Sequence, residues 1–174
     1  MSLRHAAVGV VALGAVASTV LAGSGGAAAH ADVRQSLRQD VRAGWPKDEV
    51  LSNASLARAS RAAVKAAKRR GQRVTVVIME RSGVIRLVIR TRKAGPQTYE
   101  SAKRKAYTAV AFGQPTSALS GNATIRQIPG TLTLAGGVPV KSHGFPIAGI
   151  GVGGAPDGRI DEQIARAVRR ALCR

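Results

Sequence analysis

The chain has few of the residues that form disulfide bonds or coordinate metal ions in small folds. Its 174 residues include one Cys, two Met, one Trp, two Tyr and two Phe. Because Cys173 has no second Cys to pair with, an intrachain disulfide framework and a four-Cys zinc or iron–sulfur site are both excluded. Acidic residues are scarce too, since nine Asp and Glu stand against 27 Lys and Arg and give a formal net charge of +18. With 45% hydrophobic residues, a chain of this length is expected to form one basic domain with its own core.

The first 31 residues have the three-part layout of an export signal. Arg4 and His5 form a short basic start, an apolar run follows from Ala6 to Ala22, and Ala29-His30-Ala31 fits a cleavage site. A membrane anchor is the alternative, but the run is short for a span and contains several small or polar residues. We therefore predict a signal peptide over 1–31 and an extracellular or cell-envelope location. Cleavage would leave 143 residues and, with Arg4 gone, a net charge of +17.

The next segment predicts a leader followed by a basic helix. Residues 32–55 carry both charge signs with little periodicity, and we expect a leader or short helix ahead of a domain spanning 56–174. From Leu56 to Arg70, cations recur every three or four residues with Ala between them, which predicts a surface helix with one basic face. Gly71 is a suitable stop for this helix.

Two runs rich in β-branched residues predict a hairpin. They cover 74–79 and 84–90 and flank a turn that contains Gly83. The first run is apolar on both faces and is expected in the centre of a sheet, whereas the second alternates and is expected to be half-buried. A second helix is predicted from about Thr98, as its N-cap, to near Gly113.

The second half of the chain predicts further strands and a last helix. Pro115 opens a short helical turn, and Gly121 is expected to return the chain to extended structure. The apolar runs that predict strands cover 131–134, 138–140 and 147–152. Pro139 belongs at a sheet edge because it cannot donate to a strand ladder. With a last helix over Arg159–Leu172, the order of elements predicts an α+β domain in which helices pack on an antiparallel sheet of about five strands.

Several short motifs occur together in an order that resembles the GlcG/HbpS family. In chain order they are GPQTYES at 95–101, KRKAYTAV at 103–110, PTS at 115–117, LAGGVPV at 134–140 and GFPIAGIGVGGAP at 144–156. The similarity extends from roughly Leu56 to Ala171. It implies a profilin-like fold, symmetric homo-oligomers of octamer size, and binding of haem with slow haem breakdown and iron release. It also implies a membrane sensor histidine kinase as a partner.

The resemblance assigns a contact with the haem iron to Thr116 of the PTS motif. Composition alone does not point to haem, because the usual iron ligands are His, Cys, Met and Tyr, and few of these remain after export. The residues alone favour a different role for Thr116, in which its hydroxyl caps a backbone amide at a helix start. Both interpretations stay open at this point.

The second predicted helix carries the other candidate contacts for haem. Lys103, Arg104 and Lys105 form the cationic run that leads towards the PTS motif, and we predict that they attract the haem propionates. Tyr107, on the same helix, is a further candidate contact.

The same helix departs from the family at a surface iron site. Close relatives are expected to carry Glu-x-x-Glu there, where two carboxylates one turn apart could bind free iron. In this chain Glu100 is followed by Lys103, which should repel iron and pair with Glu100 instead. Glu100 is the remaining candidate for this metal site.

Two functions from different classes stay open. The first is an exported haem-binding protein that sequesters and slowly degrades haem, with weak enzymatic activity at most. The second is a non-enzymatic module of the same fold for another small molecule such as a corrinoid. Nucleotide and nucleic-acid binding are not favoured, because Gly149, Gly151 and Gly153 alternate within a predicted strand without a P-loop Lys, and exported proteins rarely meet nucleic acid.

Overall fold

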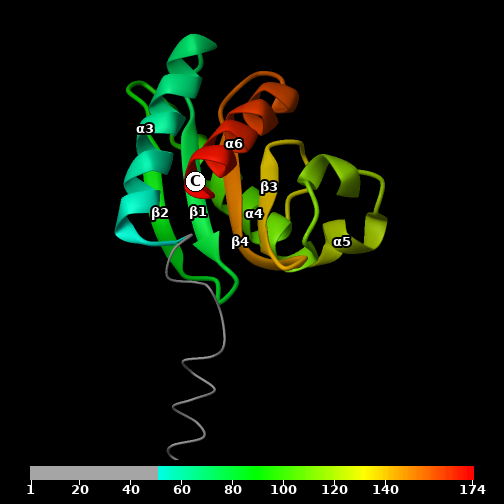
Figure 1. Cartoon of the computed structure of the whole chain (residues 1–174). Helices are drawn as coiled ribbons and strands as arrows, with labels where there is room; N and C mark the ends of the chain where they lie inside the picture. The colour runs from blue at the N-terminus through cyan, green and yellow to red at the C-terminus, as the bar shows by residue number, and fades with distance from the viewer. Residues whose placement is uncertain (1–50) are drawn as a thin grey trace, which may run out of the picture. The chain divides into compact units, whose positions relative to one another are not determined.

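The computed structural model describes residues 51–174, shown in Figure 1. The expected signal peptide and most of the expected 32–55 leader lie outside the described residues. The elements, in chain order, are α3 (Asn53–Arg69), β1 (Thr75–Glu80), β2 (Ile85–Arg90), α4 (Gln97–Phe112), the 3-10 helix η1 (Thr116–Leu119), α5 (Ala123–Gln127), β3 (Gly137–Ser142), β4 (Phe145–Gly153) and α6 (Gly158–Leu172). No helix in this part of the chain is long and apolar enough to cross a membrane.

The four strands form one antiparallel sheet in the order β2-β1-β4-β3. The apolar strand β1 lies in the interior of the sheet, as its sequence predicts, and β2 alternates between half-buried and exposed residues along one edge. Pro139 lies in β3, the other edge strand, which confirms the edge placement. The α+β class and the antiparallel sheet are therefore confirmed.

Helices cover both faces of this sheet. On one face α6 packs over β3 and β4, α3 packs over β2, and the two helices contact each other. The larger hydrophobic core fills this layer, with Val76 and Ile150 from the sheet packed among Ile164 and Val168 of α6. On the other face α4 packs on β4, β1 and β3. Figure 1 shows α5 beyond β3, at the edge of the sheet.

Alternating glycines in β4 let α4 lie directly on the strand. A side chain at Gly151 would overlap the carbonyl oxygen of Ala102, and one at Gly149 would overlap that of Ala106. The residues between these glycines point to the opposite face and are buried in the larger core. The glycine pattern therefore serves close packing of a helix on a sheet, as the sequence favours.

Two predicted elements are wrong, and both errors lie between α4 and β3. The run 131–134 is not a strand, because its polar groups bond to neighbouring helices: the Thr131 hydroxyl donates to the carbonyl of Ile125 in α5 (2.7 Å), and the Leu132 amide donates to the Thr108 hydroxyl of α4 (2.8 Å). The chain after Gly121 turns into α5 instead of extended structure. The sheet consequently has four strands instead of about five.

The helix starts also differ in detail from the sequence prediction. Helix α3 begins at Asn53 instead of Leu56, because the Ser52 hydroxyl accepts a hydrogen bond from the Ser55 amide (3.2 Å) and caps the first turn. Thr98 lies inside α4 and is not its N-cap; its hydroxyl bonds to Gly95 O and to the Thr75 hydroxyl of β1, both at 2.7 Å. The hydroxyl of Thr98 thus joins α4 to the sheet.

Candidate functional site

Hydrogen bonds of Thr116 hold the turn that carries the PTS motif against the start of β3. The Thr116 side chain is fully buried. Its hydroxyl donates to the carbonyl of Leu134 (2.7 Å) and accepts from the amide of Gly137 (2.8 Å). The helix-cap role that the residues alone favour is therefore wrong, because the amide that the hydroxyl satisfies belongs to β3 and the helix that Thr116 begins has no side-chain cap.

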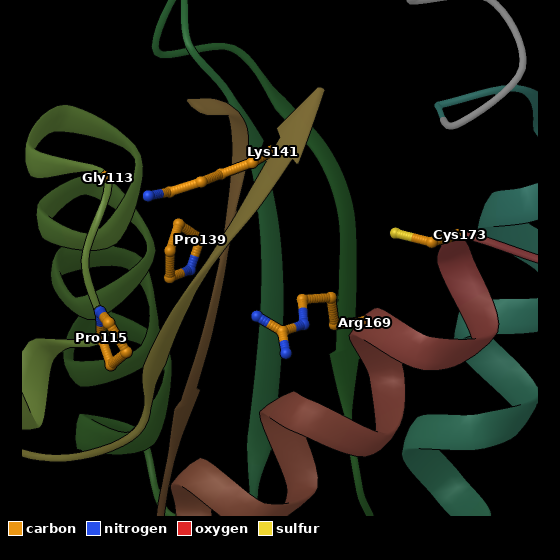
Figure 2. Close-up of a pocket in the computed structure, with 6 residues that line it drawn as sticks. All are labelled: Gly113, Pro115, Pro139, Lys141, Arg169 and Cys173. Atoms are coloured by element: carbon orange, nitrogen blue, oxygen red, sulfur yellow. The ribbon is translucent and has the colours of Figure 1, made fainter. Parts of the chain in front are cut away.

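Two surface pockets flank this turn. The one beside Pro115, which we call the β3-edge pocket, has a volume of about 370 Å³. Figure 2 shows its lining residues, which come from three places in the fold: Gly113 and Pro115 after α4, Pro139 and Lys141 on β3, and Arg169 and Cys173 on α6. The pocket thus wraps around the edge of the sheet.

The interior of the β3-edge pocket combines two prolines with two cations. In Figure 2 the rings of Pro115 and Pro139 lie near each other, and the guanidinium of Arg169 extends from α6 into the space beside β3. The Lys141 side chain runs towards Gly113, whose missing Cβ would lie 3.7 Å from the Lys141 Cε. Among residues 51–174, neither Lys141 nor Arg169 takes part in an ion pair.

Cys173 adds a thiol at the rim of this pocket. Partial burial raises the pKa of the Cys173 thiol, and the positive charge of Arg169 opposes this shift only in part. The side chain is therefore a neutral thiol near neutral pH.

The second pocket has about 270 Å³ and is electrostatically different. Ser117 lines it together with four residues of α6. Arg166 pairs with Glu162 at 2.5 Å, and Arg159 pairs with Asp157 at 2.8 Å. Arg159 also lowers the pKa of Asp157, which keeps that carboxylate ionised. The arginines here are already paired, so this pocket is less suited to an additional anion than the β3-edge pocket.

Lys105 is the one member of the predicted cationic run that is buried, with 3% of its surface exposed. Its ammonium donates to the Asp161 carboxylate (3.0 Å) and to the carbonyl of Val152 (2.9 Å). The other carboxylate oxygen of Asp161 accepts from the Ala155 amide (3.0 Å). This ion pair joins α4, α6 and the end of β4, and it leaves Lys103 and Arg104 as the accessible cations of the run.

The remaining candidates lie along α4 and around the loop before β3. Lys103 pairs with Glu100 at 3.8 Å, as the sequence predicts. Arg104 donates to the carbonyl of Thr131 (2.6 Å), and its Nε is buried without a hydrogen-bond partner among the described residues. Tyr107 is 38% exposed. Roles for these residues towards haem, and for Glu100 towards iron, stay predictions.

The sequence alone indicates neither the β3-edge pocket nor the carboxylate that pairs with Lys105. The pocket joins residues more than fifty positions apart in the chain, so no local motif indicates it. Asp161 could be recognised only as an acidic residue in the first turn of α6. Within residues 51–174, no group of three or more His, Cys, Asp or Glu is arranged to hold a metal ion.

The chain has relatives among known protein families and solved structures. Residues 51–170 match the family described as "Haem degrading protein HbpS-like". This chain belongs to the HbpS-like family. A double mutant of HbpS from Streptomyces reticuli is 49% identical, with a TM-score of 0.64, and the match covers 68% of this chain and 84% of that protein.

Two further solved structures resemble this HbpS-like chain. A crystal structure of HbpS is 50% identical, with a TM-score of 0.64, over 68% of this chain and 86% of that one. A PduOC–haem complex is 28% identical, with a TM-score of 0.62, over 69% of this chain and 93% of that one. A search of curated protein sequences gave no significant match.

Proposed function

We propose that this chain is an exported haem-binding protein that sequesters haem and slowly degrades it, releasing or buffering the iron. The observation that carries this proposal is the match of residues 51–170 to the HbpS-like haem-degrading family. A related protein that is 28% identical has been solved as a haem complex, which gives independent support.

The donor set of the described residues fits a haem that is held loosely. Residues 51–174 contain one His, one Cys, one Met and two Tyr. Met79 is buried in β1, and His143 lies in the exposed turn between β3 and β4, so the two are not placed to hold opposite sides of one iron. A weak and exchangeable haem site suits uptake and release of haem. When bound, the haem iron would supply the redox centre for oxidative ring opening, with dioxygen and an external reductant as co-reactants.

Thr116 is the proposed contact with the haem iron, following the family resemblance. Because its hydroxyl is buried and bonded to Leu134 and Gly137, this contact requires the turn at Pro115 to move away from β3. The position of the Soret band tests the contact. We expect Thr116→Ala to shift the band and Thr116→Ser to preserve it. An unshifted band in the alanine variant removes Thr116 from the iron site without affecting the haem-binding proposal.

The family resemblance also leads us to propose export, assembly into an octamer and a sensor histidine kinase as partner. The net charge, which is +18 for the whole sequence and +17 after the expected cleavage, favours binding to a negatively charged surface or to an acidic partner domain outside the cell. Exposed cations of α3, among them Arg61, Lys65 and Lys68, make no ion pair within the described part of the chain and are suited to such a contact.

A non-enzymatic module for a corrinoid is the alternative, and one titration separates the two functions. We expect haemin to give a saturable Soret band with the purified mature chain and cyanocobalamin to give no saturable spectral change. Saturable binding of cyanocobalamin without binding of haemin would overturn the proposal. Bilin formation and free iron, measured in the same haemin mixture in air with added reductant, then report the slow breakdown.

A further inference from the structure

We propose that the β3-edge pocket holds the propionates of the bound haem, with Lys141 and Arg169 as their partners. This assignment rests on the proposed haem-binding function and adds to it a location and two residues. The sequence led us to expect the propionates at the cationic run of α4. The pocket assignment instead places the ligand beyond the end of α4, against the edge of the sheet.

Charge separates this pocket from the other candidates. Lys141 and Arg169 make no ion pair among the residues that the structure describes, and they approach the pocket from β3 and α6 respectively. In the second pocket the arginines are paired with carboxylates. In the α4 run, Lys105 is paired with Asp161 and Lys103 with Glu100, and Arg104, which has no carboxylate partner among the described residues, donates to the carbonyl of Thr131. A carboxylate ligand gains most where the cations have no carboxylate partner already.

The apolar part of the pocket suits the porphyrin. The half-buried ring of Pro115, backed by the buried Pro139, presents a rigid apolar surface that loses little side-chain entropy when a flat apolar molecule packs against it. The thiol of Cys173 is neutral and adds no negative charge to repel a propionate. A ligand with an apolar body and carboxylate ends therefore matches both parts of the lining.

The edge of β3 is available to a ligand because Pro139 discourages strand addition. An edge strand with free amides can pair with a strand of another molecule, but proline offers no amide and interrupts such pairing. Pro139 is buried although it lies in an edge strand, because the η1 turn packs beside β3. The pocket at this edge is thus bounded by side chains and by the turn.

Thr116 is a positioning residue in this arrangement. Its hydroxyl bonds hold the turn against Leu134 and Gly137, and Gly137 lies two residues before Pro139. These bonds fix the distance between the two prolines of the pocket. While these bonds are in place the PTS motif acts on the ligand through Pro115, and contact of the Thr116 hydroxyl with the iron requires them to break.

The first experiment neutralises the two cations and blocks the two propionates. Haemin and haemin dimethyl ester are titrated into the wild type, into Lys141→Gln/Arg169→Gln, and into the control Arg61→Gln/Lys65→Gln, which removes the same charge from the exposed face of α3. We expect about a tenfold loss of haemin affinity in the pocket variant and less than about a twofold loss in the control. The dimethyl ester should bind the pocket variant and the wild type equally.

The second experiment uses Cys173 as a built-in reporter and needs no substitution. It is the only Cys of the chain, so alkylation by iodoacetamide adds mass at one position. Because burial raises the pKa of this thiol, the reaction is followed at a fixed alkaline pH. We expect saturating haemin to slow alkylation several-fold, because the porphyrin covers the sulfur that lines the pocket.

The outcomes separate this inference from the function on which it rests. The wild type could bind haemin while Cys173 reacts at an unchanged rate and the pocket variant binds haemin like the control. That result would overturn the pocket assignment and leave the proposed function in place. A selective loss of affinity in Lys103→Gln would then assign the propionates to α4. Failure of the wild type to bind haemin overturns the proposed function together with the inference.

Discussion

At the scale of single residues, the buried polar groups of this chain hold neighbouring elements together. Thr116 connects the turn after α4 with the start of β3, and Thr98 connects α4 with β1. Sequence patterns identified Thr116 as notable through its motif, yet they could not show its partners, because Leu134 and Gly137 are about twenty residues away. Hydrogen-bond partners of this kind depend on the fold and not on local sequence.

The first prediction concerns the hydroxyl of Thr116. Its removal in Thr116→Ala leaves the Gly137 amide without its acceptor, and we expect a loss of about 1–3 kcal/mol in the free energy of unfolding. Thr116→Ser keeps the hydroxyl and should recover most of this loss. Urea unfolding followed by circular dichroism measures both. Equal stability of the alanine variant and the wild type would show that the hydrogen bond seen here does not stabilise the fold.

A second prediction at this scale concerns the contact between β4 and α4. A methyl group at Gly151 would overlap the Ala102 carbonyl oxygen, so Gly151→Ala should lower stability by about 3 kcal/mol or more. Gly121→Ala is the matched control, because a Cβ there meets no atom within 4 Å, and it should change stability by less than about 0.5 kcal/mol. Similar thermal melts for the two variants would contradict the close packing of α4 on the strand.

At the scale of elements, hydrophobic alternation and apolar runs in the sequence predicted strands correctly only where the segment has a partner strand in the sheet. The hairpin of β1 and β2 and the edge position of β3 follow from the sequence, because hydrophobic alternation and proline report directly on pairing. The run 131–134 alternates in the same way but forms no strand, since its threonine and backbone groups bond to the α5 region and to α4. A local pattern cannot show which neighbours its backbone finds.

The third prediction tests the ion pair that joins α4 to α6. Asp161→Asn keeps an oxygen for the Ala155 amide but leaves the Lys105 ammonium buried without a counter-charge, so we expect a loss of about 3–5 kcal/mol. Glu100→Gln breaks the exposed pair with Lys103 and should cost less than about 1 kcal/mol. Adding Lys105→Met to the Asp161→Asn variant should recover part of the loss. Equally small losses in both single variants would contradict a structural role for the buried pair.

At the scale of the whole molecule, family membership explains what composition left open. Charge and cysteine count excluded several classes of protein, but the scarcity of His, Cys, Met and Tyr gave no sign of haem. The ordered motifs between 95 and 156 supplied that expectation, and the match over residues 51–170 confirms the family. The β3-edge pocket required the folded chain, because α4, β3 and α6 meet there only in three dimensions.

The fourth prediction concerns assembly. From the family resemblance we expect the mature chain to form closed symmetric assemblies of about eight subunits at micromolar concentration. Multi-angle light scattering behind a sizing column measures the mass directly, and high salt in the running buffer prevents retention of this basic protein. A monomer across the accessible concentration range would contradict the prediction.

The most direct test of the account is a crystal structure of the mature chain grown with haemin, with data collected at the iron absorption edge. We predict one anomalous iron peak per chain beside the turn at Pro115, with porphyrin density against Pro139 and propionates near Lys141 and Arg169. An iron peak on the outer side of α4, near Lys103 and Tyr107, would contradict the location. Crystals without an iron peak after growth in saturating haemin would contradict haem binding itself.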